Sequence, residues 1–155
     1  MSAISYIDRR GKLQDYFDRT AHDAWAKLTS DAPVSGIRAT VRAGRDQMRT
    51  SILSKLPQDL SGKRVLDAGC GTGELAGYIM ERGYKNVYAV DQSKDMIEYC
   101  HDQWPEMRAL HGNVLVPMTY DKGSFTHIFM TGDTIYHIQD KLTLLRNLYY
   151  WLMPN

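Results

Sequence analysis

The sequence predicts an α/β protein with a doubly wound parallel sheet, and three observations support this prediction. After about residue 60, short apolar runs typical of buried strands alternate with segments whose apolar residues recur at helical spacing. The stretch from Gly69 to Gly73 places three glycines between the first of these strands and the next helix. At 155 residues and 43% hydrophobic composition, the chain can bury one sizeable core. We therefore expect one domain over 61–155, preceded by a helical segment over 1–60.

Helical spacing dominates these first sixty residues, which we call the arm. Residues 4–29 are expected to be helical, with a break at residues 31–33. A second helix is predicted after Ser35, because apolar residues then fall on one helical face, namely Ile37, Val41, Met48, Ile52 and Leu56. Pro57 should end this helix, since proline cannot continue one.

The domain after the arm is predicted to contain four strands. The expected strands cover residues 63–66, 86–90, 107–110 and 125–130. The helices between and after them are expected over 74–82, from near Ser93 to the Trp104-Pro105 pair, and over 141–152. Strands that alternate with helices form parallel, doubly wound sheets, and the strand order expected for such a fold is 3-2-1-4.

The chain stops at Asn155, directly after the last predicted helix and where a fifth strand is expected. We therefore expect a C-terminally truncated domain in which the fourth strand is an open edge, unless a partner or further sequence covers it. The composition also changes near Asp91, from Ala- and Arg-rich to Tyr-, Met- and His-rich. Truncation and the joining of two unlike halves are both compatible with this change.

The glycine turn is the strongest functional signal. Glycines at a strand-to-helix turn let a ligand approach the backbone and the first helical amides. The spacing of the small residues Gly71, Gly73 and Ala76 is a weak match to a dinucleotide-binding motif. Asp67, however, could face the ammonium group of a methionine moiety. Asp91 ends the next strand, where a carboxylate can hold ribose hydroxyls. These features favour S-adenosylmethionine. The alternative is a plain tight turn, with Asp91 capping the helix that starts near Ser93.

Composition and charge argue against several other classes of protein. A net charge of +1 and a pI near 7.8 do not favour nucleic-acid binding. The sequence has neither a signal peptide over Met1 to Arg10 nor an apolar run of the roughly 20 residues that a membrane span needs, so we expect a soluble cytoplasmic protein. Cys70 and Cys100 are expected to be free thiols, and the histidines show no metal-ligand spacing, so no bound metal is predicted.

The residues also carry a resemblance to known families. The segment from Val65 to Ala76, with Asp91, resembles motif I and the acidic end of the second strand in class I S-adenosylmethionine-dependent methyltransferases, which have a Rossmann-like fold. Four arm segments resemble the family of magnesium protoporphyrin IX methyltransferases, and these segments are residues 16–20, 24–26, 34–38 and 41–49. That resemblance implies methylation of a porphyrin propionate in chlorophyll or bacteriochlorophyll biosynthesis, and with it a protein partner from the same pathway.

The resemblance also implies roles for individual residues. Gly69, Gly71 and Gly73 would line the methionine part of the cofactor, with Asp67 nearby. Asp91 would hold the ribose, and Gln92 and Met96 would pack beside ribose and adenine. Many relatives have an aspartate that binds the adenine amino group where this chain has Asn113, whose amide oxygen could accept the same bond or whose amide could flip to donate. His137 would act near the transferred methyl group, although a histidine satisfied by backbone is the alternative. The family's arm tyrosine after its tryptophan is not evident, since Leu28-Thr29 stands there.

The arm supplies the candidate groups for the substrate. Four arginines recur along one stripe of the second arm helix and could grip an anionic molecule, and these are Arg38, Arg42, Arg45 and Arg49. An ordinary solvated helix face is the alternative. Tyr16, Phe17 and Trp25 could stack on a flat macrocycle or could instead anchor the arm to the core.

Three functions remain open at the level of sequence. The leading hypothesis is an O-methyltransferase for a magnesium porphyrin propionate, a small-molecule substrate. This chemistry needs no strong base, because a carboxyl group is ionised above pH ~4 and the cofactor is already an activated electrophile. The other hypotheses are a methyltransferase for another small molecule and a non-catalytic fragment that binds S-adenosylmethionine.

Overall fold

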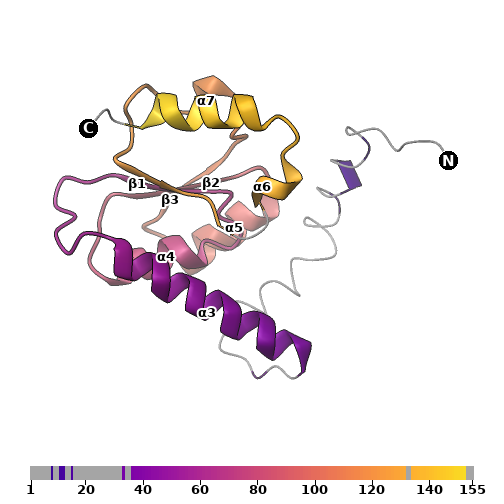
Figure 1. Ribbon diagram of the computed structural model, residues 1–155, viewed down its shortest axis with the longest axis vertical. Helices are drawn as coiled ribbons and strands as arrows, with labels where there is room; N and C mark the ends of the chain where they lie inside the picture. Colours follow the sequence, from indigo (N-terminus) through magenta and orange to yellow (C-terminus); the bar gives the residue numbers. More distant parts are fainter. Residues whose placement is uncertain are drawn as a thin grey trace.

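The computed structural model describes residues 8, 11–12, 15, 33, 36–131 and 134–152. Within these residues the chain forms a four-stranded parallel sheet in the order β3-β2-β1-β4, as predicted (Figure 1). The strands are β1 (Val65–Ala68), β2 (Val87–Asp91), β3 (Arg108–His111) and β4 (His127–Phe129). The helices are α3 (Ile37–Lys55), α4 (Glu74–Glu81), α5 (Lys94–Gln103), η2 (Pro117–Thr119), α6 (Thr134–His137) and α7 (Lys141–Trp151).

The strand β1 lies at the centre of the sheet, and all four of its residues are buried. It pairs with β2 on one side and with β4 on the other. Because both faces of a doubly wound sheet are covered by helices, this strand is apolar apart from Asp67. The strand ends two residues later than predicted, since Asp67 and Ala68 pair with Ala89 and Val90 of β2.

Helices cover both faces of the sheet. Helices α3, α4 and α5 lie on one side and α7 on the other (Figure 1). Successive strand residues point to opposite faces, so Val65 joins a core cluster with Leu75 and Ile79, whereas Leu66 joins a second cluster with Leu144 and Trp151. Two hydrophobic cores, one on each face, therefore hold the sheet in place.

The edge strand β4 is shorter than predicted. It covers only residues 127–129, because the backbone of Phe125 is paired elsewhere. The Phe125 amide donates to the Trp151 carbonyl at 2.8 Å, and Phe125 forms an isolated parallel bridge with Leu152 at the end of α7. The short helices η2 and α6 were not predicted.

The second arm helix is confirmed as α3, but its C-terminal part belongs to the core. Leu53, Leu56 and Leu60 are buried in the same cluster as Leu75 and Ile79. A division of the chain at residue 60 stays a prediction, and most of the helix predicted over 4–29 lies outside the described residues. None of the helices in the described ranges is long and apolar enough to cross a membrane.

Candidate functional site

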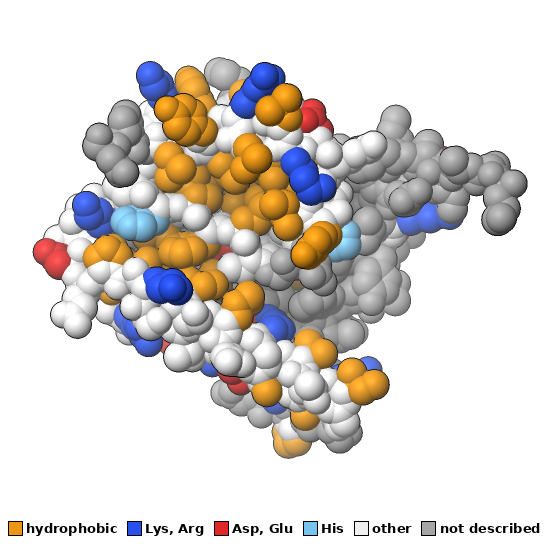
Figure 2. Space-filling view, viewed as in Figure 1, with side chains coloured by type: hydrophobic (Ala, Val, Ile, Leu, Met, Phe, Trp, Pro, Cys, Tyr) orange, Lys and Arg blue, Asp and Glu red, His pale blue; other side chains and the backbone are white. Residues whose placement is uncertain are grey.

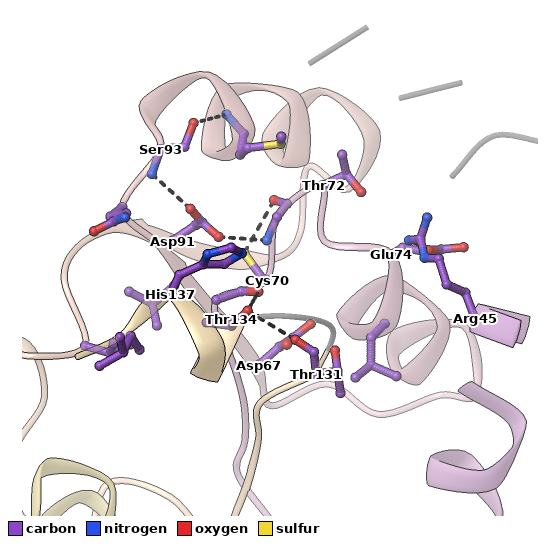
Figure 3. Close-up of a pocket in the computed structure, with 18 of the residues that line it drawn as sticks. Arg45, Asp67, Cys70, Thr72, Glu74, Asp91, Ser93, Thr131, Thr134 and His137 are labelled. Atoms are coloured by element: carbon purple, nitrogen blue, oxygen red, sulfur yellow. Dashed lines mark hydrogen bonds and ion pairs between the residues drawn. The ribbon is translucent and has the colours of Figure 1, made fainter. Parts of the chain in front are cut away.

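A cavity of about 530 Å³ lies at the carboxyl ends of the strands and is closed on one side by α3 (Figure 3). The sheet side contributes the glycine loop and the residues that follow β2 and β3. The α3 side contributes Val41, Gly44, Arg45, Met48 and Arg49. Ligands of doubly wound proteins bind at this edge of the sheet, because the loops after the strands gather there.

The three glycines of the loop have positive φ angles but meet different surroundings. The angles are +77° at Gly69, +55° at Gly71 and +76° at Gly73, a region that favours glycine. A Cβ at Gly69 would collide with the side chain of Thr134, and one at Gly73 with the sulfur of Cys100. A Cβ at Gly71 would meet nothing within 4 Å. Of the three, only Gly71 has open space where a side chain would lie, while the other two glycines allow close packing within the protein; Gly69 and Gly71 both line the cavity.

Asp67 is a buried carboxylate in the wall of the cavity. Its side chain is 1% exposed, and its Oδ1 atom has no hydrogen-bond partner among the described residues. Burial, and to a smaller degree the nearby Asp91 charge, raises the pKa of Asp67 to about 7. A buried, incompletely paired carboxylate is costly in the absence of a cation. Asp67 therefore marks where a positively charged group would be stabilised.

Asp91 ties the glycine loop to the next helix. Its Oδ2 accepts from the Gly71 amide at 2.9 Å, and its Oδ1 accepts from the Ser93 amide at 2.9 Å. The N-cap of α5 is Ser93, whose hydroxyl oxygen accepts from the Met96 amide at 3.3 Å. Asp91 thus supports the turn before α5 without being the cap itself, and it still lines the cavity.

The residues expected beside ribose and adenine also line the cavity. Met96 is buried and Gln92 is exposed, at the start of α5. Asn113 follows β3, and its Oδ1 accepts from the Leu115 amide at 2.9 Å. In this section of the wall Met96 and Val114 supply apolar side chains, and Gln92 and Asn113 supply amide groups.

His137 lies at the last position of α6, and its side chain is exposed and borders the same cavity as Asp91 and Cys70 (Figure 3). The helix is placed by Thr134, whose hydroxyl donates to the Thr131 carbonyl at 3.1 Å and packs on Gly69. Thr134 was missed at the sequence level. The signal that could have found it is weak, because nothing local links a threonine to a glycine 65 residues earlier.

The arginine stripe is divided by the structure. Arg45 and Arg49 border the cavity, but both form ion pairs with Glu74 at the start of α4. The Nη1 atom of Arg49 lies 3.2 Å from Oε1 of Glu74. Burial raises the pKa of Glu74, and the two guanidinium groups partly offset that effect. The Arg49 guanidinium also lies 3.8 Å from the ring centre of Tyr78. Figure 3 shows Arg45 and Glu74 side by side at the α3 edge of the cavity.

The other predicted substrate residues lie away from the cavity or cannot be placed. Arg38 and Arg42 are on α3 but do not line the cavity. Tyr16 lies outside the described residues, as do Phe17 and Trp25. Glu74, which sequence reasoning missed, was detectable as the only acidic residue in the first turn of α4. No group of three or more potential metal ligands occurs in the part of the chain that the structure describes.

Comparison with known proteins places this geometry in a family. Residues 65–155 match the family model described as "Methyltransferase domain". The chain is 44% identical over 138 residues to the magnesium-protoporphyrin O-methyltransferase of Rhodobacter capsulatus, which covers 85% of this chain and 60% of that protein. It is 34% identical over 96 residues to phosphoethanolamine N-methyltransferase 3 of Arabidopsis thaliana, covering 60% of this chain and 19% of that protein.

Among solved structures, the fold is similar to magnesium protoporphyrin IX methyltransferase from Synechocystis PCC 6803 with bound SAH. The TM-score is 0.75 at 22% identity, and the match covers 91% of this chain and 67% of that one. The chain thus spans about 60% of the length of the Rhodobacter relative. Because the family model matches more than half of the residues of this chain, the chain belongs to the methyltransferase-domain family.

Proposed function

We propose that this chain binds S-adenosylmethionine in the cavity and takes part in methyl transfer to a propionate carboxylate of magnesium protoporphyrin IX, a step of chlorophyll or bacteriochlorophyll biosynthesis. The observation that carries the proposal is the buried, incompletely paired Asp67 carboxylate in the wall of a cavity that the bare backbone of Gly71 also lines. The choice of acceptor is supported by the 44% identity to a magnesium-protoporphyrin O-methyltransferase.

The residues present fit this cofactor. The Oδ1 atom of Asp67 would accept from the ammonium group of the methionine moiety, which compensates the buried charge. Gly71 would let that moiety lie against the loop, because no side chain intervenes. The two oxygens of Asp91 accept from the Gly71 and Ser93 amides and the residue lines the cavity; because a carboxylate oxygen can accept more than one hydrogen bond, Asp91 could also accept from the ribose hydroxyls.

The chain's own residues would bind, orient and desolvate rather than perform acid-base chemistry. The bound cofactor supplies an activated methyl group on its sulfonium sulfur. A propionate is already ionised near neutral pH, so no residue has to remove a proton before the transfer. His137 would donate a ring N–H to one carboxylate oxygen and hold the other toward the methyl group, which is a positional contribution.

The helix α3 would form the substrate side of the cavity. Val41 and Met48 are 43% and 38% exposed and border the cavity, so they offer apolar surface to a macrocycle. Figure 2 shows hydrophobic side chains along the outer part of α3, at the lower right. Arg42 and Arg38, one and two turns before Arg45, would attract the propionate that is not methylated.

A second candidate acceptor is a smaller molecule. The match to a phosphoethanolamine N-methyltransferase covers 60% of this chain, so the cofactor half does not by itself fix the acceptor. Binding of S-adenosylmethionine without methyl transfer is the third candidate, and the experiment below distinguishes it from the other two.

The test separates cofactor, acceptor and catalysis. Purified protein is titrated with S-adenosylhomocysteine by calorimetry and with magnesium protoporphyrin IX by the Soret band, and both are then incubated with labelled S-adenosylmethionine. We expect both ligands to bind and the monomethyl ester to form. Cofactor binding with no Soret change would contradict the porphyrin proposal, and cofactor and porphyrin binding with no ester would favour the non-catalytic reading. Absence of cofactor binding would overturn the whole assignment.

A further inference from the structure

The loop after β3 forms one wall of the cavity. Residues 112–115 line the cavity, and Pro117–Thr119 continue the loop as η2. Helix α7 covers the face of the sheet opposite to α3, α4 and α5 (Figure 1). None of its residues, all of which the structure describes, lines the cavity. Two side chains of α7 nevertheless reach the loop from the side that faces away from the cavity.

These two side chains are Asn147 and Trp151, which are 4% and 0% exposed. The Nδ2 atom of Asn147 donates to the carbonyl oxygen of Val114 at 2.9 Å. The indole Nε1 of Trp151 donates to the carbonyl oxygen of Pro117 at 3.1 Å. Because Asn147 and Trp151 are four residues apart, they lie on one face of α7, and this face holds the main chain of the loop at two points.

Packing alone does not account for an asparagine at position 147. The core cluster on this side of the sheet is hydrophobic and includes Val114, Leu144 and Trp151. A buried amide costs free energy in such surroundings unless it is hydrogen-bonded, whereas a leucine, with as many side-chain heavy atoms, carries no such cost. What Asn147 supplies, and a leucine cannot, is a hydrogen-bond donor for the Val114 carbonyl.

The bond to Val114 fixes one peptide group of the cavity wall. In a planar trans peptide, the C=O of one residue and the N–H of the next point in opposite directions. The Val114 carbonyl points toward α7, and the Leu115 N–H of the same peptide group donates to Oδ1 of Asn113 at 2.9 Å. Asn147 therefore holds the peptide group that in turn holds the Asn113 side chain in the cavity wall.

We propose that Asn147 is a positioning residue for the nucleoside part of the cofactor. From the far side of the loop it sets the orientation of the peptide group between Val114 and Leu115, and with it the part of the wall that borders the base. This inference rests on the proposed cofactor, and Asn147 acts through the loop rather than by touching the ligand. A loop that is already held in place needs no ordering when the cofactor binds, so less entropy opposes binding.

The substitution Asn147→Leu tests this role, because it removes the donor and keeps the number of side-chain heavy atoms. With the Val114 carbonyl unpaired, the peptide group should turn more freely. Hydrogen exchange of the Leu115 amide, followed by NMR in the ligand-free protein, should become about 10-fold faster relative to the Ala89 amide of β2. Calorimetry should show about 10-fold weaker binding of S-adenosylhomocysteine.

Thr126→Val is the matched control. The Thr126 hydroxyl donates to the Arg64 carbonyl at 2.9 Å, which is also a bond from a side chain to the main chain, but at the amino ends of β1 and β4. The control should lower the temperature of thermal unfolding and leave Leu115 exchange and S-adenosylhomocysteine affinity within about 2-fold. Asn147→Ser, whose side chain is shorter and remains polar, is the second variant if leucine prevents folding, and it should change both quantities in the same direction.

Three results would overturn the inference. The first is unchanged exchange of the Leu115 amide in the Asn147 variant, and the second is faster exchange with unchanged affinity. The third is an equal loss of affinity in Thr126→Val, which would make general destabilisation the cause. If the unsubstituted protein does not bind S-adenosylhomocysteine, the proposed function fails and this inference with it, and that result is distinct from an affinity that only the Asn147 variant loses.

Discussion

The sheet wall and the α3 wall of the cavity are held in place by different forces. On the sheet side, Asp67 and Gly73 are buried, and loop amides are fixed by Asp91 at 2.9 Å. On the α3 side, Val41 and Met48 are exposed, and the cavity edge is held by the ion pairs with Glu74. Close packing specifies one wall within a fraction of an ångström, whereas partly solvated ion pairs contribute little and weaken in salt. The contrast suggests a preformed cofactor side and an adjustable acceptor side.

The largest effect on stability is expected from a comparison of Gly73, which packs against Cys100, with Gly71, which faces open space. Gly73→Ala should destabilise the protein by about 3 kcal/mol, because it adds a positive-φ penalty to a collision with Cys100. Gly71→Ala should cost only about 1 kcal/mol but should abolish cofactor binding, because its Cβ projects into open space at the loop. Thermal unfolding and calorimetry measure the two effects, and equal loss of stability in both variants would remove the distinction between the glycines.

The next effect is a pH dependence centred on Asp67. Its pKa is about 7 in the folded chain against an ordinary value of 3.8, so its contribution to stability is present below pH ~4 and is lost as the pH rises through 7. Cofactor binding needs the ionised form to pair with an ammonium group. Affinity should therefore fall about tenfold between pH 7.5 and pH 6, while the ligand-free protein becomes more stable.

Asp67→Asn should remove most of the pH dependence of cofactor affinity and of the stability of the ligand-free protein. At pH 7.5 it should weaken cofactor binding and raise the stability of the ligand-free protein. Calorimetry and thermal unfolding at several pH values provide the measurements. Asp102→Asn, which removes an exposed carboxylate on α5, is the control and should change neither profile. A cofactor affinity of Asp67→Asn that retained the original pH dependence would show that another group titrates.

A smaller effect is expected from Glu74→Gln, which tests whether ion pairs hold α3. The substitution removes the carboxylate that links Arg45 and Arg49 of α3 to α4, so hydrogen exchange of α3 amides should become about 5-fold faster in low salt, and the difference should shrink in 1 M salt. Glu98→Gln breaks the exposed Lys94–Glu98 pair, whose Nζ–Oε1 distance is 3.1 Å, and should have no effect on α3. Unchanged α3 exchange in Glu74→Gln would mean that the ion pairs with Glu74 do not position the helix.

The smallest effect is predicted for the outer arginines. Arg38→Ala and Arg42→Ala should each weaken binding of magnesium protoporphyrin IX about 3-fold, as expected for solvated ion pairs, and leave cofactor affinity unchanged. Soret titration and calorimetry report the two affinities. Lys55→Ala, at the other end of α3, is the charge-matched control. Parallel loss of both affinities in either arginine variant would argue against a role confined to the acceptor.

Local patterns predicted most of the sheet wall. The strand order and α4, α5 and α7 followed from periodicity and from capping or breaking residues such as Ser93 and Pro105, which act over a few positions. The packing around the glycines was not predicted. Gly69 and Gly73 lie against Thr134 and Cys100, which are distant in sequence, and the role of the three glycines beside the cofactor stays a prediction.

The α3 wall was less predictable, because its contacts join residues far apart in the chain. The stripe of arginines was visible, but the pairing of Arg45 with Glu74 spans 29 positions and depends on how α3 packs against α4. The roles of Arg38, Arg42, Arg45 and His137 toward a substrate therefore stay predictions. The side-chain oxygen of Asn113 accepts from the Leu115 amide, a contact that the sequence did not predict, and the contact of Asn113 with adenine stays a prediction.

The twofold use of Asp91 has a consequence for how this site tolerates change. The Asp91 carboxylate accepts hydrogen bonds from the turn after β1 and from the turn after β2, so both turns adopt their final shape during folding, before a nucleoside binds. A ribose would meet a rigid receptor, and little ordering entropy would oppose its capture. A replacement at position 91 would remove two internal hydrogen bonds together with any contact to the ribose, so its effect on cofactor affinity would have no single cause. Position 91 is therefore a poor choice for measuring ribose recognition and a good one for testing whether the two turns are intact.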